Sequence, residues 1–384
     1  MVVFDAAAAG HHVHGMGLAM EAPTWPAITP DEAAAILARF PAAGRIEALR
    51  WHSPRPFSAA TLIETGGGGL FLKRHHRRVR TVAGLMEEHR FIAHLSAAGA
   101  PVPELLHTAE GESAVASGHW TYELQRQAAG EDVYRDRLSW TPFRSLDHAQ
   151  AAGEALARLH RASHGFEAPA RCQQPLVASF AILAAADPMA AVEAYVEARP
   201  ALAAFLADRP WRRRLSALFA ASGRGLPAIA ARQAPLWTHN DWHPSNLLWS
   251  GDGRVRTWLD FGLADRSCAA HDLAIAIERT AFAWLELGQG RDDALADPLA
   301  AQTLIAAYRM GDAADRSVVE AAIRLLPLVH IEFALSEIDY FAGIVDDRAA
   351  AALAWDTYLL GHAEWFLSPA GRDVCARLSD GGSV

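Results

Sequence analysis

The sequence predicts an α+β protein with two lobes: a small N-terminal lobe of strands around one main helix, and a larger, mostly helical C-terminal lobe. Its 384 residues exceed what a single hydrophobic core usually holds. Strand-like runs are concentrated before residue 127, whereas from about residue 131 the sequence is rich in Ala and Leu at helical spacing. We therefore expect a flexible arm at 1–28, an N-lobe at 29–127 and a C-lobe at 128–384.

Composition narrows the class of protein. Hydrophobic residues make up 51% and charged residues 21% of the chain, as in an ordinary globular protein. The net charge of -9 argues against nucleic acid as a main partner. Three widely spaced cysteines do not suggest a disulfide framework, and neither a signal peptide nor a long apolar span is apparent. We expect a soluble, cytoplasmic protein, either a monomer or a homodimer.

The elements of the N-lobe follow in order. In the arm, His11, His12 and His14 suggest a metal site but lack a closing ligand elsewhere. A capping box at 29–32 predicts a helix to about residue 40. Runs at 45–53, 59–65 and 69–75 predict strands, with the four glycines 66–69 as a hairpin turn rather than a phosphate-binding loop. A helix at 81–98, a strand at 119–126 and a hinge at 128–130 complete the lobe.

The C-lobe is predicted to be helical with one interruption. The segment 148–162 has Ala152, Leu156 and Leu159 on one helix face. Short strands and loops are expected at 236–260, around a Gly-Asp-Gly turn. Helices resume at 271–287, around 301–309 and at 321–341. An irregular insert in a helical lobe is a suitable place for a functional site.

Two residue types are used very sparingly. Lys73 is the only lysine in the chain, and Asn240 and Asn246 are the only asparagines. A chain that otherwise replaces lysine by arginine retains a compact ammonium at one place, where chemistry can require it. These residues direct attention to the strand around Lys73 and to the segment 239–246.

The residues around 239–262 suit phosphoryl transfer. The string His-Asn-Asp-Trp-His-Pro-Ser-Asn at 239–246 is followed by Asp260-Phe261-Gly262. Transfer of a phosphate requires a carboxylate for the attacking hydroxyl, oxygen ligands for Mg²⁺ and a cation on the phosphates. Asp241 would be the base, and Asn246 and Asp260 the metal ligands. Lys73 would contact the nucleotide phosphates, held in position by an ion pair with Glu88.

These motifs resemble a known family. The string at 239–246 resembles the HxDxxxxN catalytic loop of the aminoglycoside phosphotransferase family, which also contains choline kinases, type II homoserine kinases and stress response kinases. The segments LDFG, FLKRH and EHRFIAHLSAAGAPVP resemble its metal-binding segment, its lysine strand and the helix that follows. The resemblance covers about 45–345. It implies a protein kinase-like bilobal fold and transfer from ATP or GTP, with Mg²⁺, to a hydroxyl of a small molecule.

The resemblance also implies where the nucleotide binds, and this sequence departs from the family's pattern at two places. The purine would meet the backbone at 123–127, with Arg126 among the nucleotide-binding residues. Asn240 stands where the family commonly has Gly, so we expect a left-handed backbone there. The phosphate-covering turn at 52–60 has no glycine, so Ser58, Ser53 or Arg55 would contact the phosphates instead.

Other functions and roles remain open at this stage. His239, Asp241 and His243 alternate and could form a hydrolytic metal site, although no second cluster completes it. A kinase of protein Ser or Thr, or a regulatory pseudokinase, would share the same motifs. Asp272 is expected to brace the catalytic loop. The candidate acceptor-binding residues share a helix face or follow the metal-binding segment, but they also suit a solvated surface: Glu332, Ser336, Asp339 and Glu278.

Overall fold

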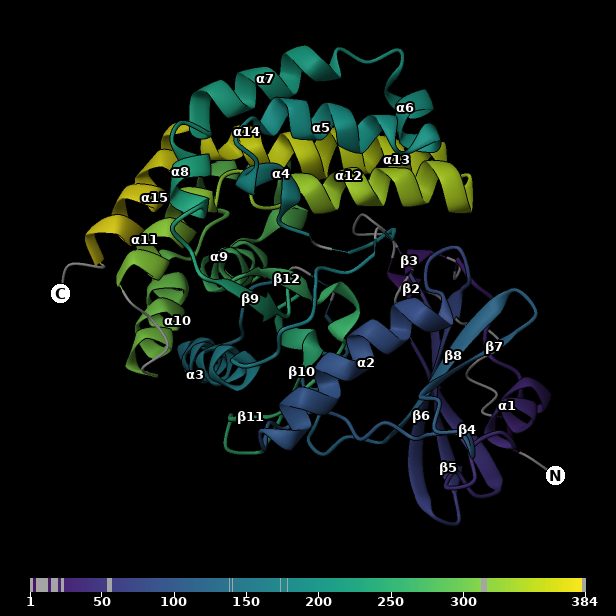
Figure 1. The fold of residues 1–384 in the computed structure, drawn as a ribbon. Coiled ribbons are helices and arrows are strands. Elements are labelled where there is room, and N and C mark those ends of the chain that lie inside the picture. Colours follow the sequence, from purple (N-terminus) through teal and green to yellow (C-terminus); the bar gives the residue numbers. More distant parts are fainter. Residues whose placement is uncertain are drawn as a thin grey trace.

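The computed structural model describes residues 24–53, 57–137, 139, 141–172, 174–177, 179–311 and 316–381, with the backbone of the pairs 3–4, 13–14 and 20–21. The sheet and α1 lie on one side, the helices gather on the other, and α2 lies between them (Figure 1). Most of the arm, with His11 and His12 and the side chain of His14, lies outside the described residues. None of the described helices combines the length and apolar character needed to cross a membrane.

The N-terminal sheet has six strands in the order β1-β4-β5-β6-β8-β7. The antiparallel strands are β4 (Ile46–His52), β5 (Ala59–Thr65), β6 (Gly68–His76), β7 (Ala114–Ser117) and β8 (Trp120–Arg126). From the arm, β1 (Val3–Phe4) joins β4 in parallel, and β2 (Val13–His14) pairs with β3 (Met20–Glu21). The residues of β1 therefore form an edge strand of the sheet.

Local signals account for the N-lobe elements. Thr29 and Glu32 form the expected capping box of α1 (Pro30–Leu37). Thr65 pairs with Gly68, which leaves a two-residue hairpin turn between β5 and β6. Gly68 has a φ of 109°, a conformation that favours glycine. The four glycines thus form a hairpin, as predicted.

Helix α2 (Val82–Ala97) connects the N-lobe to the helical C-lobe. Its buried Phe91 packs against Trp237 and Phe261, with ring centroids 5.4 and 5.9 Å apart. Phe91 and its neighbours Ile92 and Leu95 belong to the large core of the C-lobe, whereas the sheet and α1 enclose a separate, smaller core. The apolar face of α2 is therefore attached to the C-lobe.

The C-lobe is helical with irregular segments. Its helices are α3 (Leu146–Ser163), α4 (Ala181–Ala184), α5 (Pro188–Glu197), α6 (Pro200–Leu206), α7 (Trp211–Ser222), α8 (Leu226–Ala230), α9 (Ala269–Thr280), α10 (Pro298–Met310), α11 (Arg316–Leu325), α12 (Ile331–Tyr340), α13 (Arg348–Leu353), α14 (His362–Phe366) and α15 (Pro369–Gly381). The predicted helix at 321–341 is divided into α11 and α12, with Pro327 in the break. The predicted helix at 271–287 ends at Thr280.

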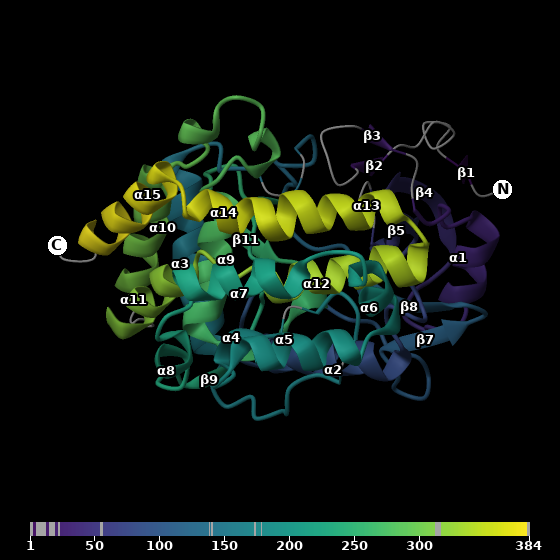
Figure 2. The ribbon, with the colours of Figure 1, turned by 90° about the horizontal axis from the view of Figure 1, so that it is seen from above.

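Two features of the C-lobe frame the site. The strands β9 (Pro235–Thr238) and β12 (Asp265–Cys268) pair with each other, as do β10 (Leu247–Trp249) and β11 (Val255–Trp258). These ladders hold the loops at 239–246 and 259–264. In Figure 1, α7 lies at the upper edge of the C-lobe and α12 lies below it, and Figure 2 shows α12 and α13 from above. π-helical turns at Phe341–Val345 and Ala354–Gly361 extend them.

Candidate active site

The loop that carries Asp241 is fixed by its own side chains. The amide nitrogen of Asn246 donates 2.9 Å hydrogen bonds to the backbone carbonyl and to Oδ2 of Asp241. His239 accepts from the backbone N–H of Asp241 at 3.2 Å and donates to the carbonyl of Leu259 at 2.8 Å. The predicted base and the predicted metal ligand Asn246 therefore lie in direct contact, and His239 braces the loop.

Asp272 holds the same loop from α9. Its carboxylate accepts from the backbone N–H groups of His239 at 3.0 Å and Asn240 at 2.8 Å, and from His160 at 3.0 Å. It is fully buried, which matches its predicted role as a brace. Burial opposes ionisation of Asp272, but the bonds and charge of His160 outweigh it and hold its pKa below the ordinary value.

Asn240 adopts the predicted left-handed backbone, with a φ of 59°. Its side chain is also used fully, since Oδ1 accepts from Thr238 at 2.8 Å, from Ser267 at 3.2 Å and from His271 at 3.2 Å. Its amide nitrogen donates to the carbonyl of Leu263 at 3.3 Å. Asn240 thus provides both the turn and four hydrogen bonds at a buried position where a glycine provides only the turn.

Asp241 has a cationic partner that the sequence analysis missed. Arg279 of α9 forms a buried ion pair with Oδ1 of Asp241, and His243 lies 3.5 Å from the same oxygen. Burial would raise the pKa of Asp241, but the charges of Arg279 and His243 hold it well below the usual range. Asp241 is therefore an ionised carboxylate with both oxygens in contact with this chain's own groups.

Lys73 lies opposite the loop on β6 and reaches the second predicted metal ligand. Its ammonium is 2.9 Å from Oδ1 of Asp260, which follows β11. Burial opposes the charge of Lys73, but Asp260, Glu123 and Glu88 outweigh it and hold its pKa above the ordinary value. The pKa of Asp260 is lowered correspondingly, because Lys73 outweighs the effect of burial. The structure thus brings Lys73 and Asp260 together.

The expected ion pair between Lys73 and Glu88 is replaced by another contact. The carboxylate of Glu88 lies 3.6 Å from the guanidinium of Arg171. Arg171 donates to the carbonyls of Gly262 at 3.0 Å and Gly84 at 2.9 Å. Arg171 therefore joins α2 to the segment that carries Asp260, and Glu88 acts on Lys73 only through its charge. Arg171 stands in a loop without a recognisable motif and therefore could not be predicted from the sequence.

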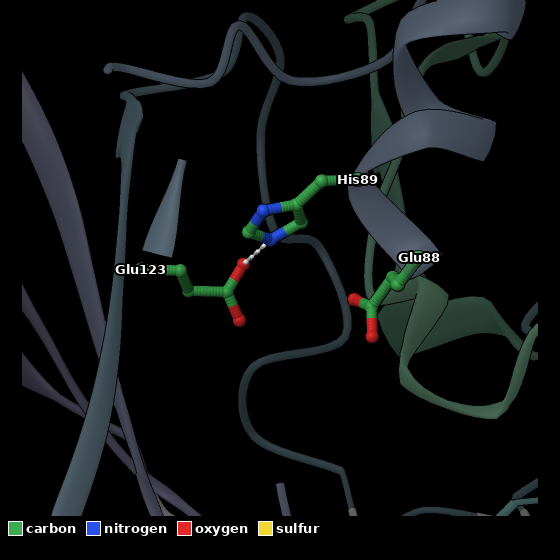
Figure 3. Close-up of side chains that lie close together, drawn as sticks. All are labelled: Glu88, His89 and Glu123. Carbon is green, nitrogen blue, oxygen red and sulfur yellow. Dashed lines mark hydrogen bonds and ion pairs between the residues drawn. The ribbon is translucent and has the colours of Figure 1, made fainter. Parts of the chain in front are cut away.

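A second buried network lies behind Lys73. Glu123 of β8 accepts from His75 and from His89, both at 3.0 Å, and His89 accepts from Ser113 at 2.8 Å. Figure 3 shows His89 directed towards Glu123, with Glu88 alongside. Because the histidine bonds outweigh burial, the pKa of Glu123 is lowered well below its ordinary value. Its negative charge is one of those that stabilise the ammonium of Lys73.

The same network bears on metal binding. The ligand atoms of Glu88, His89 and Glu123 lie within 4.8 Å of one another. In the part of the chain that the structure describes, no corresponding group is formed by His239, Asp241 and His243, the set considered for a hydrolytic metal. Both ring nitrogens of His239 are engaged by the backbone. The geometry therefore does not support the hydrolase alternative.

The structure places some of the predicted nucleotide contacts at the edge of the site. Ser58 directly precedes β5, at the turn where a phosphate contact was expected, and Arg55 lies outside the described residues. Arg126 is 3.7 Å from Glu104, and its side chain is 35% exposed. The backbone N–H groups of Arg126 and Gln127 donate to the carbonyls of Glu104 and Gly69. Those two N–H groups are therefore engaged within the lobe, and a purine contact in the segment 123–127 stays a prediction that involves other backbone groups.

The predicted acceptor face of α12 has a structural use. Glu332 accepts from the backbone N–H of Ile182 at 2.9 Å, and Ser336 from that of Leu176 at 2.7 Å. Asp339 accepts from the N–H of Leu202 at 3.3 Å. These side chains hold the segment 176–202 against α12 and are not a solvated surface.

The neighbouring residue on α12, Glu337, has a different environment. It is fully buried, and neither of its carboxylate oxygens has a hydrogen-bond partner among the described residues. Burial raises its pKa to about 8; the charge of Arg279 opposes this effect, and Asp241 and Glu278 add to it. Glu337 was not predicted from the sequence, because an acidic residue on an apolar helix gives no sign of which helix face is enclosed.

Comparisons with known proteins identify the family and the fold. A family model described as the phosphotransferase enzyme family matches residues 31–315. A search of curated proteins found no match.

Among solved structures, the chain is similar to a microcompartment-associated aminopropanol kinase (17% identity, 91% of this chain and 98% of that chain, TM-score 0.57). It is also similar to an amicoumacin kinase in complex with AMP-PNP, Ca²⁺ and Ami (13%, 86% and 94%, 0.56). A third similar structure is an aminoglycoside phosphotransferase from Alicyclobacillus acidocaldarius subsp. acidocaldarius DSM 446 (16%, 93% and 96%, 0.53). These similarities confirm the predicted protein kinase-like, α+β fold.

Proposed function

Because this chain belongs to the phosphotransferase enzyme family, we propose that it transfers the γ-phosphate of ATP or GTP to a hydroxyl of a small molecule. Asp241 is the base in this proposal. The nucleotide binds to the lobe formed by 29–127 and the acceptor to the lobe formed by 128–384. The protein acts in the cytoplasm, where the nucleotide is abundant.

The observation that carries the proposal is the placement of two pairs. Asp241 is bonded to Asn246 at 2.9 Å, and Asp260 is bonded to Lys73 at 2.9 Å. One pair comes from the catalytic loop, and the other joins the N-terminal sheet to the segment after β11. A base, two oxygen ligands and a cation are the groups that transfer of a phosphate requires.

The donor set fits Mg²⁺. The amide nitrogen of Asn246 is occupied by Asp241, which leaves its carbonyl oxygen as the available ligand atom. The Asp260 side chain is 40% exposed and carries a negative charge. Oxygen ligands of this kind are what Mg²⁺ prefers. When bound, Mg²⁺ would neutralise charge on the nucleotide phosphates.

The chain's own residues supply the remaining functions. The Asp241 carboxylate accepts the hydrogen bond of the acceptor hydroxyl, orients it and takes its proton as the new phosphate ester forms. Lys73 exchanges Asp260 for a phosphate oxygen of the nucleotide. Arg171 keeps Glu88 and the carbonyl of Gly262 in place, so that the charge around Lys73 is unchanged when the nucleotide leaves.

The names of two similar structures support a small-molecule acceptor. One is an aminopropanol kinase and the other an amicoumacin kinase. The acceptors of both proteins differ widely, so we propose the acceptor only as a hydroxyl-bearing small molecule. ATP is supported as a donor by the AMP-PNP in the second structure.

The test is release of ADP or GDP in a panel of amino alcohols, amino sugars, sugars and nucleosides, with Mg²⁺ present. The wild-type protein should release nucleoside diphosphate with at least one acceptor class. Asp241→Asn also loses the ion pair with Arg279, so nucleotide binding is measured as the thermal shift relative to the variant's own melting temperature. We expect the variant to abolish release while nucleotide affinity stays within about threefold, because the proposed nucleotide contacts are made by Lys73 and Asp260 and the lost carboxylate is the base. Full turnover by that variant would exclude Asp241 as the base. Asp252→Asn, in an exposed turn, serves as the control.

A further inference from the structure

The acceptor side of Asp241 is crowded by this chain's own groups. Oδ2 of Asp241 accepts from Asn246, and Oδ1 is held by Arg279 with His243 at 3.5 Å. An incoming hydroxyl needs a lone pair of the same carboxylate. The side-chain exposures of Arg279 and Asp241 are 4% and 11%, so little solvent competes for either group. Arg279 is therefore the group whose position decides how Oδ1 can meet an acceptor.

A second carboxyl faces the same arginine. The guanidinium of Arg279 lies 5.0 Å from the ring centroid of Phe333 on α12. Glu337 is one helical turn further along α12 and shares that face. It is fully buried, with both oxygens lacking a hydrogen-bond partner among the described residues. Leaving a buried polar group unpaired is destabilising.

Charges from several elements act on Glu337. Burial raises its pKa to about 8, while Arg279 opposes this effect and Asp241 and Glu278 contribute to it. Tyr358, on the second π-helical turn, also interacts electrostatically with Glu337. Near neutral pH the carboxyl is therefore mostly protonated. Its carbonyl oxygen can still accept a bond from a guanidinium, so receiving Arg279 requires no loss of a proton.

We propose that Glu337 is a positioning residue for phosphoryl transfer: it receives the guanidinium of Arg279 when an acceptor hydroxyl takes the place of Arg279 at Oδ1 of Asp241. This inference rests on the proposed function. Arg279 therefore pairs with Asp241 when no acceptor is bound, and with Glu337 when an acceptor is bound. The unpaired carboxyl is then explained, because it is paired only in the working state. Release from Arg279 also makes Asp241 a stronger base at the step that uses it.

Glu337→Met separates this role from a structural one. Methionine is apolar and of similar length, so it removes an unpaired buried group and should raise the melting temperature by a few degrees. It also removes the second partner of Arg279, so kcat should fall at least tenfold while KM for the nucleotide stays within about threefold. Glu337→Gln keeps a carbonyl oxygen and should restore kcat to within about threefold of the wild type.

Glu332→Met is the matched control on the same helix. The carboxylate of Glu332 accepts from the backbone N–H of Ile182 at 2.9 Å, so its loss should lower the melting temperature and leave kcat per folded enzyme unchanged. An unchanged kcat in Glu337→Met, or no recovery in Glu337→Gln, would overturn the proposal. A melting temperature of Glu337→Met below that of the wild type would also overturn it, because Glu337 would then be paired already in the resting protein.

The two proposals fail in different ways. If the wild type releases no nucleoside diphosphate with any acceptor, the proposed function fails. The melting temperatures of the Glu337 and Glu332 variants need no acceptor and still decide whether Glu337 is unpaired at rest. A rise for Glu337→Met beside a fall for Glu332→Met supports that part of the inference on its own.

Discussion

Replacing Asn240 by Gly tests what the side chain contributes at a position whose left-handed backbone a glycine can also adopt. Asn240 has a φ of 59°, where glycine is less strained than asparagine by about 1 kcal/mol. Glycine also makes the unfolded chain more flexible, which offsets roughly 0.5–1 kcal/mol of that gain. The relief of backbone strain and the greater flexibility of the unfolded chain therefore nearly cancel in the free energy of unfolding.

The side chain decides the outcome. Its oxygen accepts from Thr238, Ser267 and His271, and its nitrogen donates to Leu263, all at buried positions. We count the shortest bond, from Thr238, and one of the two at 3.2 Å; leaving each of these two partners unpaired costs about 1–2 kcal/mol, which gives a loss of roughly 2–4 kcal/mol. We expect Asn240→Gly to lower the free energy of unfolding by about 2–4 kcal/mol.

Urea titration followed by tryptophan fluorescence measures this difference as a shift in midpoint at constant slope. Asp346→Gly is the control, because Asp346 has a φ of 60° but an exposed side chain. That variant should be neutral or more stable by up to about 1 kcal/mol. If Asn240→Gly is as stable as the wild type, the four side-chain bonds contribute nothing net and the reasoning fails.

Two further variants test the nucleotide cation and the loop brace. Lys73→Ala should raise KM for the nucleotide roughly 10- to 100-fold in steady-state assays, which corresponds to the loss of one charge-assisted hydrogen bond. Arg50→Ala is the control: the Arg50 side chain is 54% exposed and belongs to an exposed ion pair, so KM should not change. Asp272→Asn replaces one accepting oxygen by an NH₂ group facing backbone N–H donors, so it should lower kcat and reduce the unfolding free energy by about 2–4 kcal/mol in urea titrations. Unchanged KM in the first or unchanged stability in the second would contradict these roles.

The fold was predictable because its signals are local. The capping box before α1, the glycine hairpin and the apolar spacing of α2 are each contained within a short stretch of sequence. The break between α11 and α12 was missed because the apolar pattern continues through Pro327. A periodic pattern reports which residues are buried, and it does not report where the backbone bends.

The site was predictable where it follows a motif and not where it depends on tertiary contact. Asp241, Asn246, Lys73 and Asp260 were assigned from spacing, and the structure brings them together in two pairs. Arg279 stands on α9, 38 residues from its partner, with nothing in its helical context to mark it. Charged residues of this kind are identified only when the fold shows which carboxylate they face.

Apolar packing holds one face of α2 to the C-lobe, and hydrogen bonds hold the other face to the sheet. The contact with the sheet is therefore the one that we expect to change when the two lobes move. Towards the C-lobe, Phe91 packs against apolar side chains, and exposing this surface to water would lose a large part of the free energy that its burial contributes. Towards the sheet, His89 is held by hydrogen bonds to Ser113 and Glu123, which water can replace at little net cost. Any movement of the sheet relative to the helical lobe should therefore carry Glu88 with the helical lobe and Lys73 with the sheet. The distance between these two side chains then measures that movement, and a pair of spectroscopic labels placed nearby on α2 and β6 can report it.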